Sequence, residues 1–105
     1  MRCKVLLTQA AKNDLDKVYL GVYDACLDEK KTRKYISELI DTIEKKADYP
    51  ESGIPFYFGD LFTGYRYVIY KSYLAFYRIS NNIMIVDRIL FGRSNYCEVL
   101  LTQRN

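Results

Sequence analysis

The hydrophobic residues near the N-terminus form a short strand-like run, and those after it recur with a helical period. The short apolar run at 3–8, CKVLLT, predicts a strand. Thr8 then stands where its side chain can accept a hydrogen bond from an amide of a first helical turn. The following apolar residues recur at spacings of three and four, which predicts an amphipathic helix. This stripe comprises Ala11, Leu15, Val18, Val22 and Cys26.

A second helical period begins at Tyr35 and continues to Ala47 within KYISELIDTIEKKA. Pro50 is expected to end this helix, because proline cannot continue the hydrogen-bond ladder. The polar segment LDEKKTRK separates the two periods, so the pair predicts an antiparallel helical hairpin. Its charged part, DEKKTRK, is interpreted as the solvated corner and the start of the second helix, with a binding patch as the alternative.

Residues 50–64, PESGIPFYFGDLFTG, contain both prolines and three of the five glycines, and we expect them to form a loop between helix and sheet. Three runs rich in Tyr, Ile, Val and Phe then predict strands at 65–70, 73–80 and 83–91.

Two-residue connections, Lys71-Ser72 and Asn81-Asn82, join these strands into hairpins, and asparagine tolerates the positive φ of such turns. The predicted order is therefore β-α-α-β-β-β, an α+β fold class. A chain of 105 residues has the size of a single domain, 1–105.

The last two predicted strands contain Arg78 and Arg88, and Arg93 follows them. The Asn81-Asn82 turn sets a register in which Arg78 faces Ile85 and lies diagonal to Asp87. We expect an Arg78–Asp87 ion pair, since a charge within an apolar sheet needs a partner.

Arg88 is expected on the opposite sheet face, with Ala75 and Tyr77. Arg93 follows a glycine beyond the strand end, where a side chain can reach outward, so it is the candidate functional cation.

Composition restricts the chemistry. The sequence has no histidine, which removes the usual general base and the commonest metal ligand. Its cysteines, Cys3, Cys26 and Cys97, are scattered without a CxxC pair, so neither a disulfide framework nor a zinc site is expected. The sequence contains neither a cluster of metal ligands nor a glycine loop that could bind phosphate, so no metal or organic cofactor is expected.

The net charge of +3 is distributed unevenly. Residues 61–105 contain six Lys or Arg, two Asp or Glu and six tyrosines. This mixture of cations and aromatic residues suits a nucleic-acid or acidic protein partner. The alternative is the ordinary composition of a β-sheet, in which tyrosine and arginine are common. No apolar run reaches the ~20 residues of a membrane span, and the N-terminal segment turns polar too early for a signal peptide. A cytoplasmic protein is expected, with no membrane partner.

Three segments, LTQAAKNDLDKVY, GYRYVIYKSYLAFYRI and IMIVDRILFGRSNY, resemble the RelE/ParE superfamily of toxins from bacterial type II toxin-antitoxin systems. The resemblance extends from about Val5 to Leu100. Its strongest signals are Gly64-Tyr65-Arg66, YLAFYRI and the closing RILFGR, although many ParE-like members have a histidine where this chain has Phe91.

The resemblance implies two antiparallel helices packed on one face of a curved, mainly antiparallel sheet. It also implies a toxin that arrests bacterial growth unless a cognate antitoxin binds it, a role connected with plasmid stabilisation. RelE-like members are metal-independent, ribosome-dependent mRNA endonucleases, whereas ParE-like members are associated with poisoning of DNA gyrase.

Cleavage of RNA at its 2'-OH needs a proton acceptor, cations for the charged phosphorane and a donor for the leaving oxygen. RelE-like toxins have an arginine on a middle strand at the position of Leu74, so this chain departs from their pattern there. On the preceding strand, at most one of their two basic residues is present, as Arg66. The late arginine matches Arg93, and Tyr96 lies near the expected tyrosine.

With at most two cations of four in place, we favour a ParE-like toxin that acts on a protein target such as DNA gyrase. The alternative is an endonuclease acting on ribosome-bound mRNA, with Arg66, Arg93 and Tyr96 as catalytic residues. A third reading is a toxin fold that only binds its partner.

An apolar sheet face on the last hairpin is the predicted antitoxin site, which would give a hetero-oligomer. Coverage of this face by the chain's own tail is the alternative. The face comprises Leu74, Phe76, Ile83, Ile85 and Ile89, and the predicted partner-binding residues are Leu74, Phe76, Ile85, Ile89 and Arg93.

Overall fold

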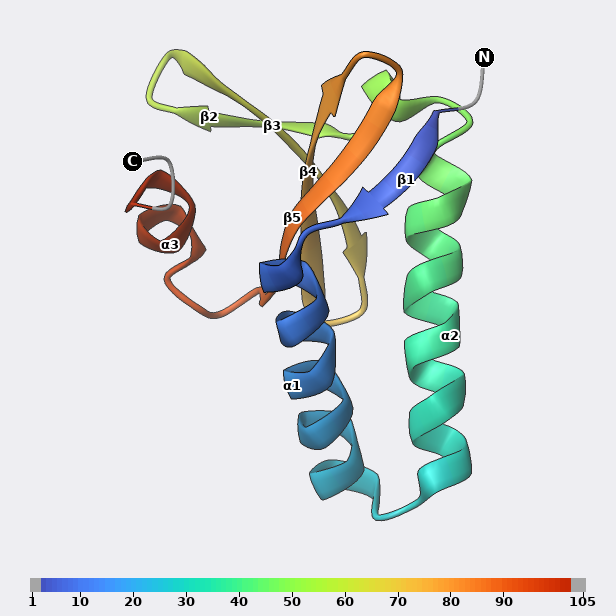
Figure 1. Ribbon diagram of the computed structural model, residues 1–105. Helices are drawn as coiled ribbons and strands as arrows, with labels where there is room; N and C mark the ends of the chain where they lie inside the picture. Colours follow the sequence, from blue (N-terminus) through green and yellow to red (C-terminus); the bar gives the residue numbers. More distant parts are fainter. Residues whose placement is uncertain (1–2, 103–105) are drawn as a thin grey trace.

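The computed structural model describes residues 3–102. Figure 1 shows its elements in chain order: β1 (Lys4–Leu7), α1 (Gln9–Cys26), α2 (Glu29–Lys46), the short 3-10 helix η1 (Pro50–Ser52), β2 (Ile54–Phe58), β3 (Leu61–Tyr70), β4 (Tyr73–Ser80), β5 (Ile83–Phe91) and α3 (Tyr96–Thr102).

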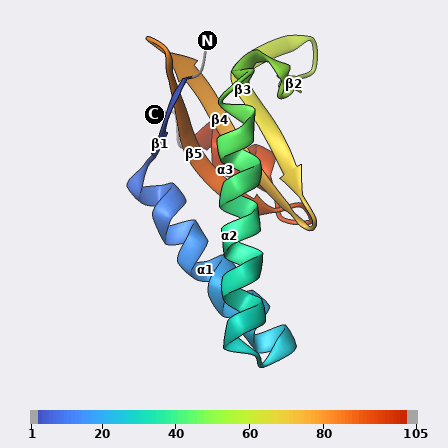
Figure 2. The same ribbon diagram turned by 90° about the vertical axis from the view of Figure 1, so that its right-hand side faces the viewer.

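The five strands form one mixed sheet in the order β1-β5-β4-β3-β2. β1 pairs with β5 in parallel, and the other neighbours are antiparallel. α1 and α2 lie side by side against one face of the sheet, and α3 lies against the other (Figures 1 and 2). The predicted α+β class, with two antiparallel helices on a mainly antiparallel sheet, is confirmed.

The start of each long helix follows from a capping side chain. Thr8 accepts a hydrogen bond from the Ala11 amide at 3.1 Å, as predicted. Asp28 accepts one from the Lys31 amide at 3.0 Å, so α2 begins at Glu29 and includes most of the charged run. α2 ends at Lys46, before Pro50, which begins η1 instead.

The two predicted hairpin turns are present. Asn81 and Asn82 have φ values of 50° and 62°, and Lys71 has a φ of 51°. Asparagine adopts this left-handed region more readily than most residues, which explains the tight connection between β4 and β5.

The predicted loop at 50–64 is wrong. This segment contains η1, all of β2 and the first four residues of β3, which begins at Leu61 rather than at residue 65. Pro55 is compatible with β2 because β2 is an edge strand, where the missing amide leaves no ladder bond unmade. Gly59, with φ 63°, supplies the turn between β2 and β3.

The main core fills the space between the helices and the sheet. Tyr77 is fully buried there, and a side-chain carbon on Gly53 would come within 1.9 Å of its hydroxyl oxygen, so only glycine fits. The large buried residues of this core are Val18, Leu39, Ile43, Tyr77, Met84 and Val86. A smaller core beneath α3 contains Tyr65, Phe76 and Leu100.

A bulge in β5 changes the predicted faces. Phe76 pairs with Arg88 and Tyr77 pairs with Val86, which leaves Asp87 as an extra residue. Arg88 is therefore opposite Phe76, and its predicted alignment with Ala75 and Tyr77 is wrong. Within residues 3–102, no helix has the length and apolar character needed to span a membrane.

Candidate functional site

Arg78 and Asp87 form the predicted ion pair between neighbouring strands. The Arg78 Nε donates to the Asp87 Oδ2 at 2.7 Å, and the register sets Arg78 opposite Ile85 as expected. The Asp87 side chain is 7% exposed and that of Arg78 is 47% exposed. Arg78 therefore neutralises the negative charge of the buried Asp87 carboxylate, which is a structural role.

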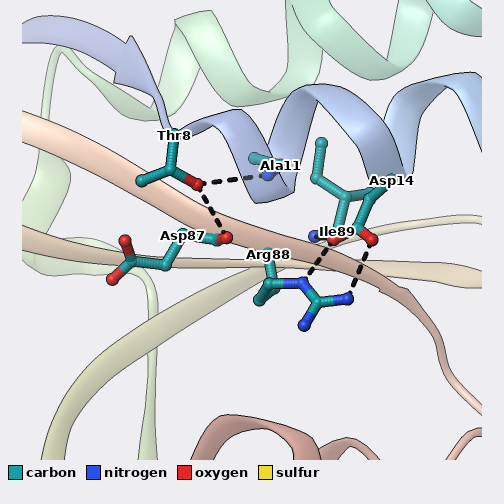
Figure 3. Close-up of polar contacts among 6 residues, drawn as sticks. All are labelled: Thr8, Ala11, Asp14, Asp87, Arg88 and Ile89. Carbon is teal, nitrogen blue, oxygen red and sulfur yellow. Dashed lines mark hydrogen bonds and ion pairs between the residues drawn. The ribbon is translucent and has the colours of Figure 1, made fainter. Parts of the chain in front are cut away.

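A second ion pair joins α1 to β5 and was not predicted. Asp14 accepts hydrogen bonds from the Arg88 Nε at 2.7 Å, the Arg88 Nη2 at 2.9 Å and the Ile89 amide at 2.9 Å (Figure 3). The Asp14 side chain is 4% exposed. Hydrogen bonding to Asp14 raises the pKa of Arg88, against the opposing effect of burial. Both Asp14 oxygens are thus occupied.

The first turn of α1 is joined to the same strand by Thr8. The Thr8 hydroxyl donates to the Asp87 carbonyl oxygen at 2.9 Å while it accepts from the Ala11 amide (Figure 3). One side chain therefore caps the helix and attaches it to β5 at the bulge.

Arg66 lies on the helix-covered face of β3. It pairs in register with Tyr77, a residue of the main core. The Arg66 Nη1 donates to the Gly53 carbonyl oxygen at 3.2 Å, and the guanidinium lies 5.4 Å from the centre of the Phe62 ring. Burial raises the pKa of Tyr77, and the charge of Arg66 opposes that shift. These contacts give Arg66 a structural role in holding Gly53.

Arg93 lies in the turn after β5 and is exposed. It forms no ion pair with any other residue of the range that the structure describes. Phe91 and Ser94, on either side of it, line a pocket of about 230 Å3 that also includes Lys17, Tyr73 and the Asp14–Arg88 pair. Lys17 is the charged lining residue outside the Asp14–Arg88 ion pair, and the exposed Arg93 stands between the lining residues Phe91 and Ser94 in the chain, so this surface suits a polar or anionic contact.

Tyr96 begins α3 and fixes that helix to the sheet. Its ring centroid lies 5.4 Å from that of Phe76 and 6.0 Å from that of Phe56. Leu100, fully buried, fills the space behind them. The part of the apolar sheet face around Phe76 is therefore covered by the chain's own C-terminal segment, which was the alternative to an antitoxin site. Residues 103–105 of that segment lie outside the described residues.

The predicted partner-binding residues separate into different environments. Phe76 is fully buried under α3, and Leu74 is half-buried beside it. Ile89 is 2% exposed and belongs to the main core, because the bulge turns it to the helix-covered face. Ile85 is half-buried and Arg93 is exposed, so these two remain accessible in part.

The three candidate catalytic residues do not meet in one site. Arg66 is aligned with Tyr77 on the helix-covered face, whereas Tyr96 packs on Phe76 on the other face. Arg93 lies in the turn between β5 and α3, three residues before Tyr96. Across residues 3–102, no group of three or more His, Cys, Asp or Glu side chains is arranged to hold a metal ion.

An exposed apolar hairpin was not predicted from the sequence. Residues 54–62, which comprise all of β2, the turn after it and the start of β3, form a hairpin that projects from the sheet away from α1 and α2 (Figure 1). The exposed large apolar side chains here are Ile54, Tyr57, Phe58, Leu61 and Phe62. The apolar runs FYF and LF on the two sides of Gly59-Asp60 were the available signal for a hairpin, but the two prolines nearby favoured a loop.

The architecture can be compared with known families and solved structures. Residues 5–96 match the family model described as the ParE toxin of the type II toxin-antitoxin system parDE, and the chain belongs to this family.

Two solved structures share the fold. The chromosomal ParDE toxin-antitoxin system from P. aeruginosa superimposes with a TM-score of 0.69 at 17% identity, covering 86% of this chain and 96% of that chain. The toxin-antitoxin complex RelBE2 from Mycobacterium tuberculosis gives a TM-score of 0.63 at 17% identity, covering 87% and 99% respectively. Among curated proteins, none matches the chain in sequence.

Proposed function

We propose that this toxin arrests bacterial growth by binding a protein target such as DNA gyrase, and that a cognate antitoxin neutralises it. The observation that carries the choice of target is the separation of Arg66 from Tyr96 on opposite sheet faces. Phosphoryl transfer without a metal requires cations and a proton acceptor converging on one phosphate. Here Arg66 is held by Gly53, and the Asp14 carboxylate is occupied by Arg88 and Ile89.

Binding to a protein target does not require several catalytic side chains to converge on one atom. One exposed arginine beside a shallow pocket can act as an anchor residue, because arginine is enriched among residues that dominate binding energy. Arg93, together with Lys17 of the pocket that Phe91 and Ser94 line, is the proposed contact to the target. DNA gyrase acts in the cytoplasm, so this proposal implies a cytoplasmic toxin.

Neutralisation by an antitoxin is supported by family membership and by the two similar solved structures, one of a ParDE toxin-antitoxin system and the other of the toxin-antitoxin complex RelBE2. A hetero-oligomer of the two proteins would follow. Of the predicted partner-binding residues, the partly accessible Ile85 is retained as an antitoxin contact, whereas the exposed Arg93 is assigned to the target.

The test is induction of the chain without antitoxin in a bacterial host, with growth and an abundant mRNA followed together. We expect growth arrest within minutes while primer extension detects no new cuts in translated codons. Cuts within codons would establish the RelE-like endonuclease instead and would overturn the gyrase proposal. Arrest that disappears when the antitoxin gene is co-expressed would support neutralisation.

A further inference from the structure

We propose that a pocket beside the α1–α2 corner binds a diphosphate group, either free or as part of a nucleotide. Three lysines line this pocket, Lys31 and Lys34 from α2 and Lys71 from the turn between β3 and β4, and we call it the lysine pocket. Its volume of about 430 Å3 is within the range of small-molecule sites. Two of the lysines belong to the charged run DEKKTRK, for which a binding patch was the alternative interpretation.

The lysine pocket carries more positive charge than its own carboxylate balances. Glu38 is the acidic residue that lines it, so three lysines leave a net charge of +2. One Glu38 oxygen accepts a hydrogen bond from the Tyr70 hydroxyl at 2.8 Å, and the other lies 3.9 Å from the Lys34 Nζ. Within residues 3–102, neither Lys31 nor Lys71 forms an ion pair. Because like charges repel, an anion between these lysines would remove an unfavourable interaction.

Aromatic rings help to position the Lys71 ammonium group. Its Nζ lies 5.1 Å from the centre of the Tyr35 ring and 5.4 Å from that of the Tyr70 ring. A contact with a ring face leaves the ammonium able to donate hydrogen bonds to an anion. A cation that is already positioned loses less entropy on binding than a freely rotating side chain does.

The backbone at Lys71 is a second, independent observation. Lys71 has a φ of 51°, in the left-handed region that lysine adopts less readily than asparagine or glycine. In the other hairpin turn, this conformation is taken by Asn81 and Asn82. Because lysine suits such a turn poorly, its presence at the edge of a cationic pocket points to a function of its side chain.

The arrangement favours a compact anion with several charges. The lysines converge on one pocket from two distant segments, whereas a nucleic-acid strand requires cations that follow its backbone. Such a track is interrupted next to the pocket, because Arg33 forms an ion pair with Glu29. A single carboxylate would balance only half of the net charge of +2. A diphosphate group places several negative charges close together, and lysine is a common phosphate ligand.

The test is a titration of the 15N-labelled full chain, made by cell-free synthesis to avoid toxicity, with sodium diphosphate at constant ionic strength. Amide chemical shifts are followed to about 20 mM ligand, and we expect a dissociation constant of about 1 mM with the largest shifts at 31–38 and 70–72. A parallel titration uses ADP. Tighter binding of ADP would identify a nucleotide as the ligand, and equal or weaker binding would identify free diphosphate.

Variants test whether the lysines act as proposed. Lys71→Asn removes the cation but keeps a residue that suits the turn, and should weaken diphosphate binding about fivefold. Lys31→Gln/Lys71→Asn should weaken it at least tenfold. Glu38→Gln should strengthen binding, because it removes a repulsive charge while its amide oxygen can still accept from Tyr70.

The matched control is Lys12→Gln/Lys45→Gln, which also removes two positive charges. Both lysines are exposed, and they lie at the start of α1 and the end of α2, the opposite end of the helix pair from the α1–α2 corner. We expect this control to bind diphosphate like the unaltered chain. Circular dichroism checks that each variant is folded.

Three results would overturn the proposal. The first is the absence of shifts at the highest diphosphate concentration. The second is equal weakening in the control variant, which would indicate attraction to the overall charge of the chain. The third is a set of shifts at the same residues with a short DNA duplex but not with diphosphate, which would assign the pocket to a nucleic acid. Growth arrest is measured separately, so failure here leaves the proposed target unaffected.

Discussion

Replacement of Asp14 by alanine tests whether the ion pair with Arg88 holds α1 against the sheet. The variant would leave the Arg88 guanidinium without its carboxylate and the Ile89 amide without its acceptor. Breaking a buried pair costs about 3–5 kcal/mol, and an unsatisfied buried amide costs about 1–3 kcal/mol. The Arg88 side chain is 19% exposed and can recover some hydration, so we expect a total loss of about 3 kcal/mol.

Urea denaturation followed by circular dichroism measures this loss. At a slope of about 2 kcal/mol per molar urea, a loss of about 3 kcal/mol lowers the midpoint by about 1.5 M. Total stability is about 5–15 kcal/mol for a domain of this kind, so the variant would still fold.

The control is Glu29→Ala, which removes the exposed pair between Glu29 and Arg33. Their side chains are 58% and 71% exposed, so we expect less than about 0.5 kcal/mol. The double variant Asp14→Ala/Arg88→Met should be less destabilised than the sum of its single variants, because it removes the uncompensated charge. A loss below about 1 kcal/mol for Asp14→Ala, with an unchanged urea slope, would refute the role assigned to this pair.

Further predictions concern the C-terminal surface, α3 and one tyrosine. Arg93→Ala should reduce growth arrest at least about tenfold in a dilution assay, with antitoxin binding retained, because an anchoring arginine typically contributes about 2 kcal/mol. Tyr96→Phe should leave growth arrest unchanged, since the ring and not the hydroxyl packs on Phe76. Leu100→Ala should cost about 2–4 kcal/mol in urea denaturation, because it opens a cavity under α3. Burial and then the hydrogen bond to Glu38 raise the pKa of Tyr70 to about 12. Because the folded chain holds this proton more tightly than the unfolded chain, the contribution to stability is complete below pH 10 and declines as pH rises to about 12. Titration of tyrosine absorbance should show this late ionisation, and Glu38→Gln should lower that pKa.

Much of the fold could be predicted because its signals are local. Thr8 and the Asn81-Asn82 turn act within a few residues, and the register that this turn sets is enough to join Arg78 to Asp87. The helices followed from their apolar periods in the same way. These features depend on backbone geometry that neighbouring residues determine.

The errors arise where distant segments decide the outcome. Asp14 and Arg88 are 74 residues apart, and no periodicity connects them. β2 contains a proline that is acceptable only because the strand lies at the sheet edge. The bulge at Asp87 turns Ile89 into the main core, which alternation alone could not indicate. The separation of Arg66 from Tyr96 likewise depends on where α3 packs.

The most direct measurement is a supercoiling assay with purified DNA gyrase, relaxed plasmid and this chain, in the absence of ribosomes. Our account predicts that supercoiling is inhibited in proportion to the chain added, that Arg93→Ala is much less effective, and that the antitoxin restores gyrase activity. Full gyrase activity in a large excess of the folded chain, together with cleavage of mRNA on purified translating ribosomes, would contradict it.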